Sequence, residues 1–265
     1  MKNVVITGST RGLGYELAAQ FLKRGCSVVI CGTREETVTR AAASLEQIGS
    51  GKVYGTKCDV SDPDDINELA DYAVRKLGSI DIWINNAGVN QSSVYCWDVP
   101  QKEIGSLIDV DLKGTIYGTQ AAIRLMSKQG SGAIYNVEGM GSNDAFQSFL
   151  AIYGTAKRAV TYFTDAAAKE AAEKGLPVII GKLSPGIMIT DFLTSVGSER
   201  GKTELNDKTK KVYNILGDKP DVIAEYLVSR MWDNKKNGVR ISWLTGAKAA
   251  YRFATAGFNK RDFFS

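Results

Sequence analysis

The sequence predicts an α/β protein built on a doubly wound parallel sheet, and two observations support this fold class. Short runs rich in β-branched residues alternate with longer helical patterns along the chain, as parallel sheets with helices on both faces require. A glycine-rich turn joins the first such run, Asn3–Thr7, to the first helical pattern, Tyr15–Lys23. With 265 residues and neither a repeat nor a low-complexity linker, we expect a single domain over residues 1–265.

Each expected strand is a short apolar run that ends at a small or polar turn. After the first strand we expect six more: Ser27–Cys31, Lys52–Cys58, Ile80–Ile84, Gly132–Val137, Val178–Lys182 and Val239–Leu244. Helices are expected at Gln101–Lys128, interrupted near Gly114 and Gly118, and at Tyr153–Glu173 and Lys219–Asp233. Another helix should begin at Ser61-Asp62-Pro63-Asp64, where a capping residue precedes an early proline.

The turn after the first strand reads Gly8-Ser-Thr-Arg-Gly12-Leu-Gly14. Glycines let the chain turn tightly and let backbone N–H groups approach a pyrophosphate at a helix N-terminus. The spacing is G-x-x-x-G-x-G rather than the common G-x-G-x-x-G, but its place between strand and helix is the one that a Rossmann-type dinucleotide site needs. We therefore expect a cofactor to contact the whole turn: Gly8, Ser9, Thr10, Arg11, Gly12, Leu13 and Gly14.

The end of the second strand indicates which dinucleotide is bound. NAD-specific sites place an acidic residue about 20 positions after the glycines, whereas this chain reads Gly32-Thr33-Arg34. A guanidinium at Arg34, with Arg11 beside it, suits a 2′-phosphate. Glu35 and Glu36 are expected to open the next helix. The pattern therefore favours NADPH/NADP⁺ over NADH.

Two further strand ends are candidates for cofactor contact. Asp59 and Val60 follow the third strand, where Asp59 either meets an adenine edge or caps a turn. The turn Asn85-Asn86-Ala87-Gly88, after the fourth strand, is small and rich in amides. Such a turn suits both a close cofactor approach and the locking of neighbouring strands, because ligands of doubly wound sheets bind at the carboxyl ends of the strands.

Tyr153 and Lys157 are the candidate catalytic pair. On a helix, a spacing of four residues places both side chains on one face, about one turn apart. A tyrosine hydroxyl has a pKa near 10, and the ammonium of Lys157 should lower the pKa of Tyr153 by stabilising the phenolate. Such a pair can donate a proton to a carbonyl oxygen. Because Tyr-x-x-x-Lys also occurs in ordinary amphipathic helices, its meaning depends on the surrounding residues.

Composition and charge limit the kinds of partner and ligand that we expect for this chain. The net charge of +4 is mild and the basic residues are scattered, so no nucleic-acid partner is expected. The chain has no histidine, and Cys26, Cys31, Cys58 and Cys96 follow no metal-ligand spacing, so we expect no metal and four reduced thiols. With no long apolar span and no signal-peptide pattern, a cytoplasmic location is expected; a removed plastid-targeting segment would leave no trace here.

Together, these motifs resemble the short-chain dehydrogenase/reductase family over essentially the whole chain. Thr7-Gly8-x-x-x-Gly12-x-Gly14, Asn85-Asn86-Ala87-Gly88, Tyr153-x-x-x-Lys157 and Ser184-Pro185-Gly186 occur in the family's order and spacing. The resemblance implies about seven strands, Tyr153 as proton donor and Lys157 on the nicotinamide ribose. It places the cofactor near Pro185, Gly186 and Thr190, and it implies a homotetramer or homodimer built on helices around residues 112–129 and 154–173.

Two positions depart from the family pattern. Asp111 stands where the family usually has asparagine, and Gly139, preceded by Glu138, stands where it usually has the catalytic serine. Gly139 offers no hydroxyl to a substrate oxygen, and Glu138 would bring a charge near the site. Ser142, or a backbone N–H near Gly139–Gly141, is expected to supply the missing donor. Asp111 is expected to hold a water that reprotonates the site through Lys157.

Within the family, the chain is most similar to the plant chlorophyll b reductase branch, which carries an acidic residue and glycine in place of the serine pair. The resemblance implies an NADPH-dependent reductase of the formyl group of chlorophyll b or a similar bulky aldehyde. Two alternatives stay open: a reductase or dehydrogenase of another small or lipid-derived carbonyl, and a non-catalytic NADP(H)-binding regulator. Retention of Tyr153 and Lys157 speaks against the regulator.

The substrate is expected to be apolar and bulky, with candidate contacts at Glu138, Met140, Phe146, Phe149 and Phe192. Tyr95, Trp97 and aromatics of the tail are further candidates, although packing in the core or between subunits is the alternative for each. A substrate-binding lid is expected at residues 190–217. The tail, residues 245–265, mixes aromatics with Lys and Arg; a membrane-surface contact is possible there, but a subunit interface is favoured.

Overall fold

Seven parallel strands form one sheet within residues 1–190 and 207–264, the part of the chain that the computed structural model describes. The order in the sheet is β3-β2-β1-β4-β5-β6-β7. The strands are β1 Asn3–Ile6, β2 Ser27–Gly32, β3 Val53–Lys57, β4 Ile82–Asn85, β5 Gly132–Val137, β6 Val178–Ser184 and β7 Arg240–Ser242. The strand order reverses between β1 and β4, which is where doubly wound sheets open a crevice for ligands.

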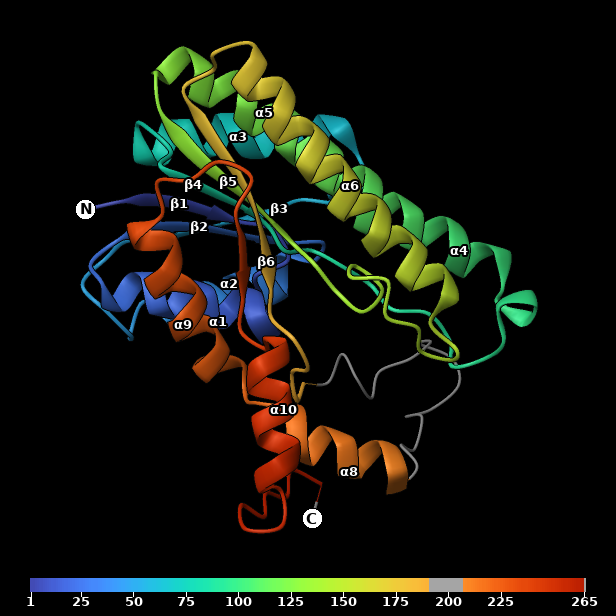
Figure 1. Ribbon diagram of the computed structural model, residues 1–265. Helices are drawn as coiled ribbons and strands as arrows, with labels where there is room; N and C mark the ends of the chain where they lie inside the picture. Colours follow the sequence, from blue (N-terminus) through green and yellow to red (C-terminus); the bar gives the residue numbers. More distant parts are fainter. Residues whose placement is uncertain (191–206, 265) are drawn as a thin grey trace.

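Helices cover both faces of the sheet (Figure 1). They are α1 Gly12–Lys23, α2 Glu35–Leu45, α3 Pro63–Leu77, α4 Gln101–Leu107, α5 Gly114–Gln129, α6 Ala151–Glu173, α8 Asp207–Leu216, α9 Pro220–Asp233 and α10 Gly246–Thr255. In β1, Val4 and Ile6 join the core under α1 and α9, whereas Val5 joins the core under α3, α5 and α6. Successive side chains of a strand point to opposite faces, so an uninterrupted apolar run is what a sheet covered on both sides requires. The predicted fold class is therefore confirmed.

The ends of α2 and α3 follow the signals in the sequence. The Asp62 carboxylate accepts a 2.9 Å hydrogen bond from the Asp64 N–H, and Pro63 occupies the first helical position of α3. Gly78 ends that helix with a φ of +80°, a conformation that glycine adopts at little cost. Glu35 and Glu36 lie in the first turn of α2, as predicted. Local signals therefore mark where α2 begins and where α3 begins and ends.

The long helical pattern before β5 is interrupted near Gly114, as predicted, but not at Gly118. The interruption is a π-helical segment, Ile108–Lys113, directly before Gly114, and α5 continues through Gly118. A Cβ at Gly118 would lie 2.0 Å from Asn85 Oδ1, and one at Gly114 would lie 2.7 Å from the Val60 side chain. These glycines allow close packing of α5 on the sheet rather than a break, so the prediction of an interruption at Gly118 was wrong.

The end of β4 is tied to its neighbours by buried amides. Asn85 Nδ2 donates to Asn136 Oδ1 at 2.8 Å and to Thr119 Oγ1 at 3.1 Å, and Asn136 Nδ2 donates to Thr164 Oγ1 at 2.9 Å. All four side chains are buried. Buried polar groups that are fully paired add rigidity and register. The network joins β4, β5, α5 and α6 beneath the site, as expected for strands locked by this turn.

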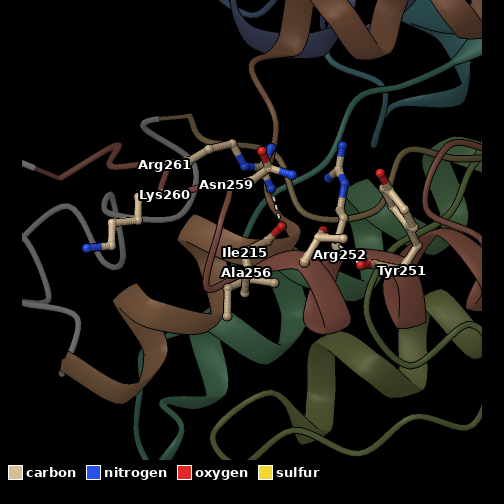
Figure 2. A pocket seen from close by; sticks show the side chains of 8 residues that line it. Ile215, Tyr251, Arg252, Ala256, Asn259, Lys260 and Arg261 are labelled. Carbon is tan, nitrogen blue, oxygen red and sulfur yellow. Dashed lines mark hydrogen bonds between the residues drawn. The ribbon is translucent and has the colours of Figure 1, made fainter.

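The C-terminal part packs on the segment between α8 and α9. The Asp218 carboxylate accepts from Arg252 Nη1 at 2.6 Å, from Arg261 Nη1 at 3.0 Å and from Trp243 Nε1 at 2.7 Å. Arg261 also donates to the Ile215 carbonyl (Figure 2). These contacts hold α10 and the tail against α8. No helix among the described residues combines the length and apolarity needed to cross a membrane.

Two sequence expectations about this half of the chain need adjustment. Residues 191–206 of the expected lid, with Phe192, lie outside the described residues, and the remainder from Asp207 is the helix α8 rather than a loop. The last strand is shorter than predicted, Arg240–Ser242, because β7 is an edge strand that pairs with only three residues of β6.

The four cysteines are free, with Cys96 exposed and the others buried.

Candidate active site

Tyr153 and Lys157 lie one turn apart near the start of α6, as their spacing predicted. Both are buried, with exposed fractions of 8% and 5%. The Tyr153 backbone N–H, which belongs to the uncapped first turn of α6, donates to Gln91 Oε1 at 2.7 Å. The Gln91 side chain therefore accepts from a free N–H group in the first turn of α6 and fixes the position of the Tyr153 backbone. Gln91 was not predicted from the sequence; its place shortly after the Asn-Asn-Ala-Gly turn is the only signal.

Asp111 forms a buried ion pair with Lys157. The distance from Lys157 Nζ to Asp111 Oδ2 is 2.8 Å, and Asp111 is fully buried. The other carboxylate oxygen, Oδ1, accepts from the Val89 N–H at 2.7 Å. Asp111 lies in the π-helical segment, which contacts α6. The carboxylate in the family's asparagine position thus neutralises the lysine directly and ties it to the turn after β4.

The pKa of Tyr153 is raised above its ordinary value. Burial is the largest cause, the Lys157 ammonium acts in the opposite direction, and the Asp111 carboxylate raises the pKa further. The expectation that Lys157 lowers the Tyr153 pKa thus has the right sign for the lysine alone, but burial and Asp111 outweigh it. The pKa of Lys157 is also raised: burial would lower it, but Asp111 and Tyr153 prevail. The neutral phenol beside a charged lysine is therefore the stable state.

Gly139 lies directly against the Tyr153 hydroxyl. A Cβ added at Gly139 would be 2.3 Å from Tyr153 Oη and 2.9 Å from its Cζ. Real Cβ atoms essentially never approach other heavy atoms below 3.0 Å. Serine cannot therefore occupy this position while Tyr153 stays where it is. Glycine at 139 is a requirement of the local packing rather than a neutral loss of a hydroxyl.

Ser142 is buried, and its hydroxyl contacts main-chain groups. Its Oγ accepts from the Gly139 N–H at 3.2 Å and donates to the Lys157 carbonyl at 3.2 Å. The Ser142 N–H in turn donates to the Gly139 carbonyl at 3.2 Å. In this arrangement the hydroxyl holds the loop after β5 on α6. Its use as a donor to a substrate stays a prediction, and it would require the hydroxyl to leave the Lys157 carbonyl.

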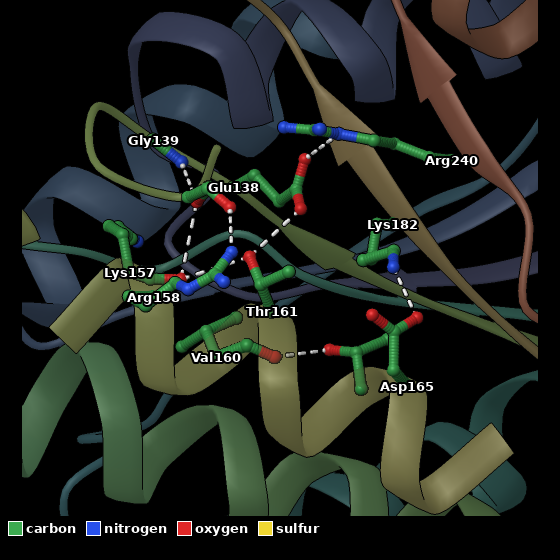
Figure 3. Close-up of polar contacts among 11 residues, drawn as sticks. Glu138, Gly139, Lys157, Arg158, Val160, Thr161, Asp165, Lys182 and Arg240 are labelled. Carbon is green, nitrogen blue, oxygen red and sulfur yellow. Dashed lines mark hydrogen bonds and ion pairs between the residues drawn. The ribbon is translucent and has the colours of Figure 1, made fainter. Parts of the chain in front are cut away.

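The Glu138 carboxylate lies between Arg240 and Thr161 (Figure 3). Its Oε2 lies 2.6 Å from Arg240 Nε on β7, and its Oε1 accepts from the Thr161 hydroxyl at 2.9 Å. Glu138 is 3% exposed. The Glu138 charge is thus paired with an arginine on β7, although it still contributes to the raised pKa of Lys157. A contact of Glu138 with substrate stays a prediction. Arg240, which lies 102 residues away, was not predicted from the sequence.

The glycine turn after β1 has the geometry of an anion cradle. Gly8, with φ +59°, packs so closely on Ala87 that a Cβ would lie 2.6 Å from its Cα. At Gly12, also with φ +59°, no atom lies within 4 Å of the Cβ position, and no side chain caps the N-terminus of α1. Open backbone N–H groups at a helix N-terminus attract phosphate. The residues present therefore fit a dinucleotide pyrophosphate at this end of the sheet.

Asn86 holds the glycine turn to the end of β4. Its Nδ2 donates to the carbonyls of Thr7 and Gly8 at 2.9 and 3.0 Å, and the N–H groups of Asn86 and Ala87 donate to Thr7 Oγ1. Gly88 lies beside Asp111, 3.1 Å from Oδ2 to the Cβ position. This turn therefore connects the cofactor cradle with the catalytic ion pair.

The other predicted cofactor residues differ in how they face the cradle. Ser9 is fully buried and its hydroxyl links the Ile6 carbonyl to the Cys31 N–H, which is a structural role. Asp59 Oδ1 accepts from the Ser61 N–H and hydroxyl, which matches the turn role offered as an alternative. The remaining residues surround the strand ends: Arg11, Thr33, Arg34 and Gly186 are exposed, Leu13, Gly14, Val60 and Pro185 are buried, and Thr10 and Thr190 lie between.

The predicted substrate residues form two groups. Met140 packs against the small cluster of Leu107, Tyr153 and Ala156. Phe146 is 84% exposed and Phe149 is 39% exposed, both in the loop between β5 and α6. A pocket of about 320 Å³ near the C-terminus (Figure 2) is lined by Tyr251, one of the tail aromatics considered above, but by none of the predicted catalytic or cofactor residues, and its arginines are paired with Asp218. We therefore place the candidate active site at the carboxyl ends of the strands, around Tyr153, where ligands of doubly wound sheets bind.

Comparisons with known proteins agree with this geometry. The family model described as short chain dehydrogenase matches residues 2–201. The chain is 33% identical over 99% of its length to a probable chloroplastic chlorophyll(ide) b reductase of Arabidopsis thaliana, of which it covers 54%. It is 35% identical over 93% of its length to a second chlorophyll(ide) b reductase of that plant, covering 71% of it. The chain spans about half the length of the first relative.

A solved structure shows the same fold. The 3-ketoacyl-(acyl-carrier-protein) reductase from Brucella melitensis, complexed with NADH, superposes with a TM-score of 0.79 over 93% of this chain and 98% of that one, at 24% identity. The match over most of the chain, the glycine cradle and the Tyr153–Lys157 pair lead to one conclusion. The chain belongs to the short-chain dehydrogenase family of oxidoreductases.

Proposed function

We propose that this protein is an NADPH-dependent reductase of the formyl group of chlorophyll b or a similarly bulky aldehyde. The observation that carries the reductase assignment is the buried array of Tyr153, Lys157 and Asp111, in which the phenol keeps its proton. A carbonyl reductase needs a proton donor at the substrate oxygen. The relatives named as chlorophyll(ide) b reductases support the substrate class.

In this proposal Tyr153 donates its proton to the carbonyl oxygen. When bound, reduced nicotinamide supplies the hydride. Lys157 is held by Asp111 at 2.8 Å, so its ammonium has a fixed position beside the phenol and the nicotinamide ribose. As the phenolate forms, that ammonium stabilises it. Lys157 can pass a proton to the Tyr153 phenolate and would then regain one from solvent; the water expected at Asp111 as that relay stays a prediction.

NADPH is preferred over NADH in this proposal because Arg11 and Arg34 are exposed at the ends of the cradle and no acidic residue precedes Arg34 at the end of β2. The cradle of Gly8, Gly12 and the N-terminus of α1 would hold the pyrophosphate. Donation to the developing alkoxide would come from the loop Gly139–Ser142. A substrate oxygen must lie close to this loop, since Gly139 touches the Tyr153 hydroxyl.

The test is a panel assay that follows NADPH or NADH consumption with chlorophyllide b, chlorophyll b and butanal. We expect NADPH turnover with the two formyl tetrapyrroles and slower turnover with NADH. Tyr153→Phe should lower kcat by about 100-fold or more, the range of a lost general acid, with the Kd for NADPH unchanged. No consumption with any substrate, together with tight NADPH binding, would favour the regulator instead. Preference for butanal would favour a small-carbonyl reductase.

A further inference from the structure

Three aromatic rings form an exposed cluster on two loops near the active site. The rings of Tyr95 and Trp97 are stacked, with centroids 4.9 Å apart and planes within 6°. Phe149 meets Tyr95 edge-on, with centroids 5.0 Å apart and an angle of 60°. The exposed fractions are 54% for Tyr95, 76% for Trp97 and 39% for Phe149. A contiguous apolar surface left in water in this way marks a binding site more often than scattered single residues do.

The cluster, which we call the aromatic platform, is attached to the catalytic residues through both loops. Tyr95 and Trp97 follow β4 in the segment whose Val89 N–H binds Asp111 and whose Gln91 side chain binds the Tyr153 N–H, both at 2.7 Å. Phe149 precedes Tyr153 by four residues, a separation that spans at most about 14 Å even when fully extended. The Phe149 and Tyr153 backbones therefore lie within about 14 Å of each other, a distance that an extended ring system can span.

Both loops are held in place although their aromatic tips are exposed. The Ser92 N–H donates to Glu103 Oε2 at 2.8 Å, which fixes the Tyr95 segment to α4. Arg158 on α6 donates to the Ser142 carbonyl at 3.1 Å and pairs with Asp144 at 3.1 Å.

The backbone of Phe149 is itself unusual. Its φ is +68°, a left-handed conformation that bulky residues rarely adopt and that clusters at functional sites. The folded chain thus keeps an aromatic ring exposed at the cost of backbone strain. Simple burial of the ring does not explain that conformation.

We infer that the aromatic platform of Tyr95, Trp97 and Phe149 binds the flat face of the substrate's ring system and determines specificity for extended planar aldehydes over small ones. The inference rests on the proposed function and names the residues that would set its substrate class. Aromatic faces favour offset stacking on other planar π systems, and an apolar surface with few polar groups suits ligands of this kind. Aliphatic aldehydes would gain no such contact.

Binding without chemistry gives the first test. The probe is pheophorbide a, a planar tetrapyrrole without a formyl group, titrated by fluorescence anisotropy against the NADP⁺-loaded protein. Trp97→Ala and Tyr95→Ala should each raise its Kd by about 3- to 10-fold, the range of one aromatic pair. Tyr162→Ala is the matched control, because Tyr162 is also an exposed tyrosine, at 77%, but lies farther along α6. It should leave the Kd unchanged.

Kinetics give the second test. For chlorophyllide b, Trp97→Ala should raise KM by a similar factor with kcat unchanged, whereas kcat/KM for butanal should stay the same. Equal Kd values for wild type and Trp97→Ala would overturn the inference, and so would an equal loss with butanal, which indicates a structural defect. If Trp97→Ala changes the mass of the assembly in light scattering but not the Kd for pheophorbide a, the platform is a subunit contact and the inference is overturned.

The two proposals can fail separately. If the protein binds pheophorbide a through Trp97 but reduces no formyl tetrapyrrole, the platform stands and the proposed reaction fails. If it reduces chlorophyllide b with the same KM in wild type and Trp97→Ala, the reaction stands and the platform fails.

Discussion

Replacing Gly139 with serine, the residue that the family usually carries at this position, should lower the activity of this protein rather than improve it. The Cβ of the new side chain would start 2.3 Å from Tyr153 Oη, which is 1.1 Å short of the 3.4 Å at which ordinary contact begins. The Gly139 main chain is held on both sides by Ser142, through its Oγ and its N–H. The strain must therefore move the tyrosine by about 1 Å.

A displacement of this size has a known order of effect. A misplacement of about 1 Å in a catalytic geometry can cost about 100-fold in rate, equivalent to about 2.7 kcal/mol of transition-state stabilisation. We expect the kcat/KM of Gly139→Ser and of Gly139→Ala to be lower than that of the wild type by about 100-fold. Alanine should do so nearly as strongly as serine, because the clash begins at the Cβ.

The assay is kcat/KM with the best aldehyde of the panel, together with the Kd for NADPH and the thermal midpoint. Gly154→Ala is the matched control: it lies beside Tyr153 on α6, but its Cβ would meet no atom closer than 3.7 Å. It should keep full activity. If the kcat/KM of Gly139→Ser equals or exceeds that of the wild type, the loop has moved instead of Tyr153, and the packing argument for glycine is refuted.

Two further predictions concern the buried charges. Asp111→Asn removes the carboxylate that raises the pKa of Tyr153, so the pKa of Tyr153 should fall and the phenol should lose its proton at a lower pH. In a pH profile of kcat/KM for reduction, the alkaline limb should therefore move to lower pH. A limb at the same pH as in the wild type would contradict the role of Asp111. Arg240→Leu leaves the buried Glu138 carboxylate without its cation, which should cost about 3 kcal/mol of unfolding free energy in urea. This is the low end for a buried pair because the Arg240 side chain is 37% exposed. Adding Glu138→Gln should recover part of the loss, and equal stability of Arg240→Leu and wild type would show that the pair contributes nothing.

Local patterns in the sequence were sufficient for the sheet and most helix ends. The apolar runs at Asn3–Ile6 and Gly132–Val137 predict strands because β-branched residues suit a pleated, doubly covered surface. Asp62 and Gly78 end α3 through contacts within a few residues. The prediction failed at Gly118, where glycine serves close packing on Asn85 and not a helix break. A glycine looks the same in sequence in both cases, because the difference lies in a neighbour from another strand.

The candidate site was predicted in part for the same reason. The helical spacing of Tyr153 and Lys157 needs only α6 to form, and the glycine cradle needs only a strand and a helix around it. The orientations of the Glu138 and Ser142 side chains were not predictable. Glu138 pairs with Arg240 on a distant strand, and Ser142 donates to the Lys157 main-chain carbonyl. A buried carboxylate must find a cation or donors to offset its desolvation, and which cation is available depends on topology.

The sequence by itself determined the class of fold and predicted the candidate nucleotide cradle and the candidate catalytic pair, since each follows from short-range periodicity, turn chemistry or helix spacing. Only the tertiary structure decided that Asp111 neutralises Lys157, that Gly139 must lack a side chain beside Tyr153, and that Tyr95, Trp97 and Phe149 meet. The physical reason is that these contacts join residues far apart in the chain, and their distances are set by how the sheet and its loops pack.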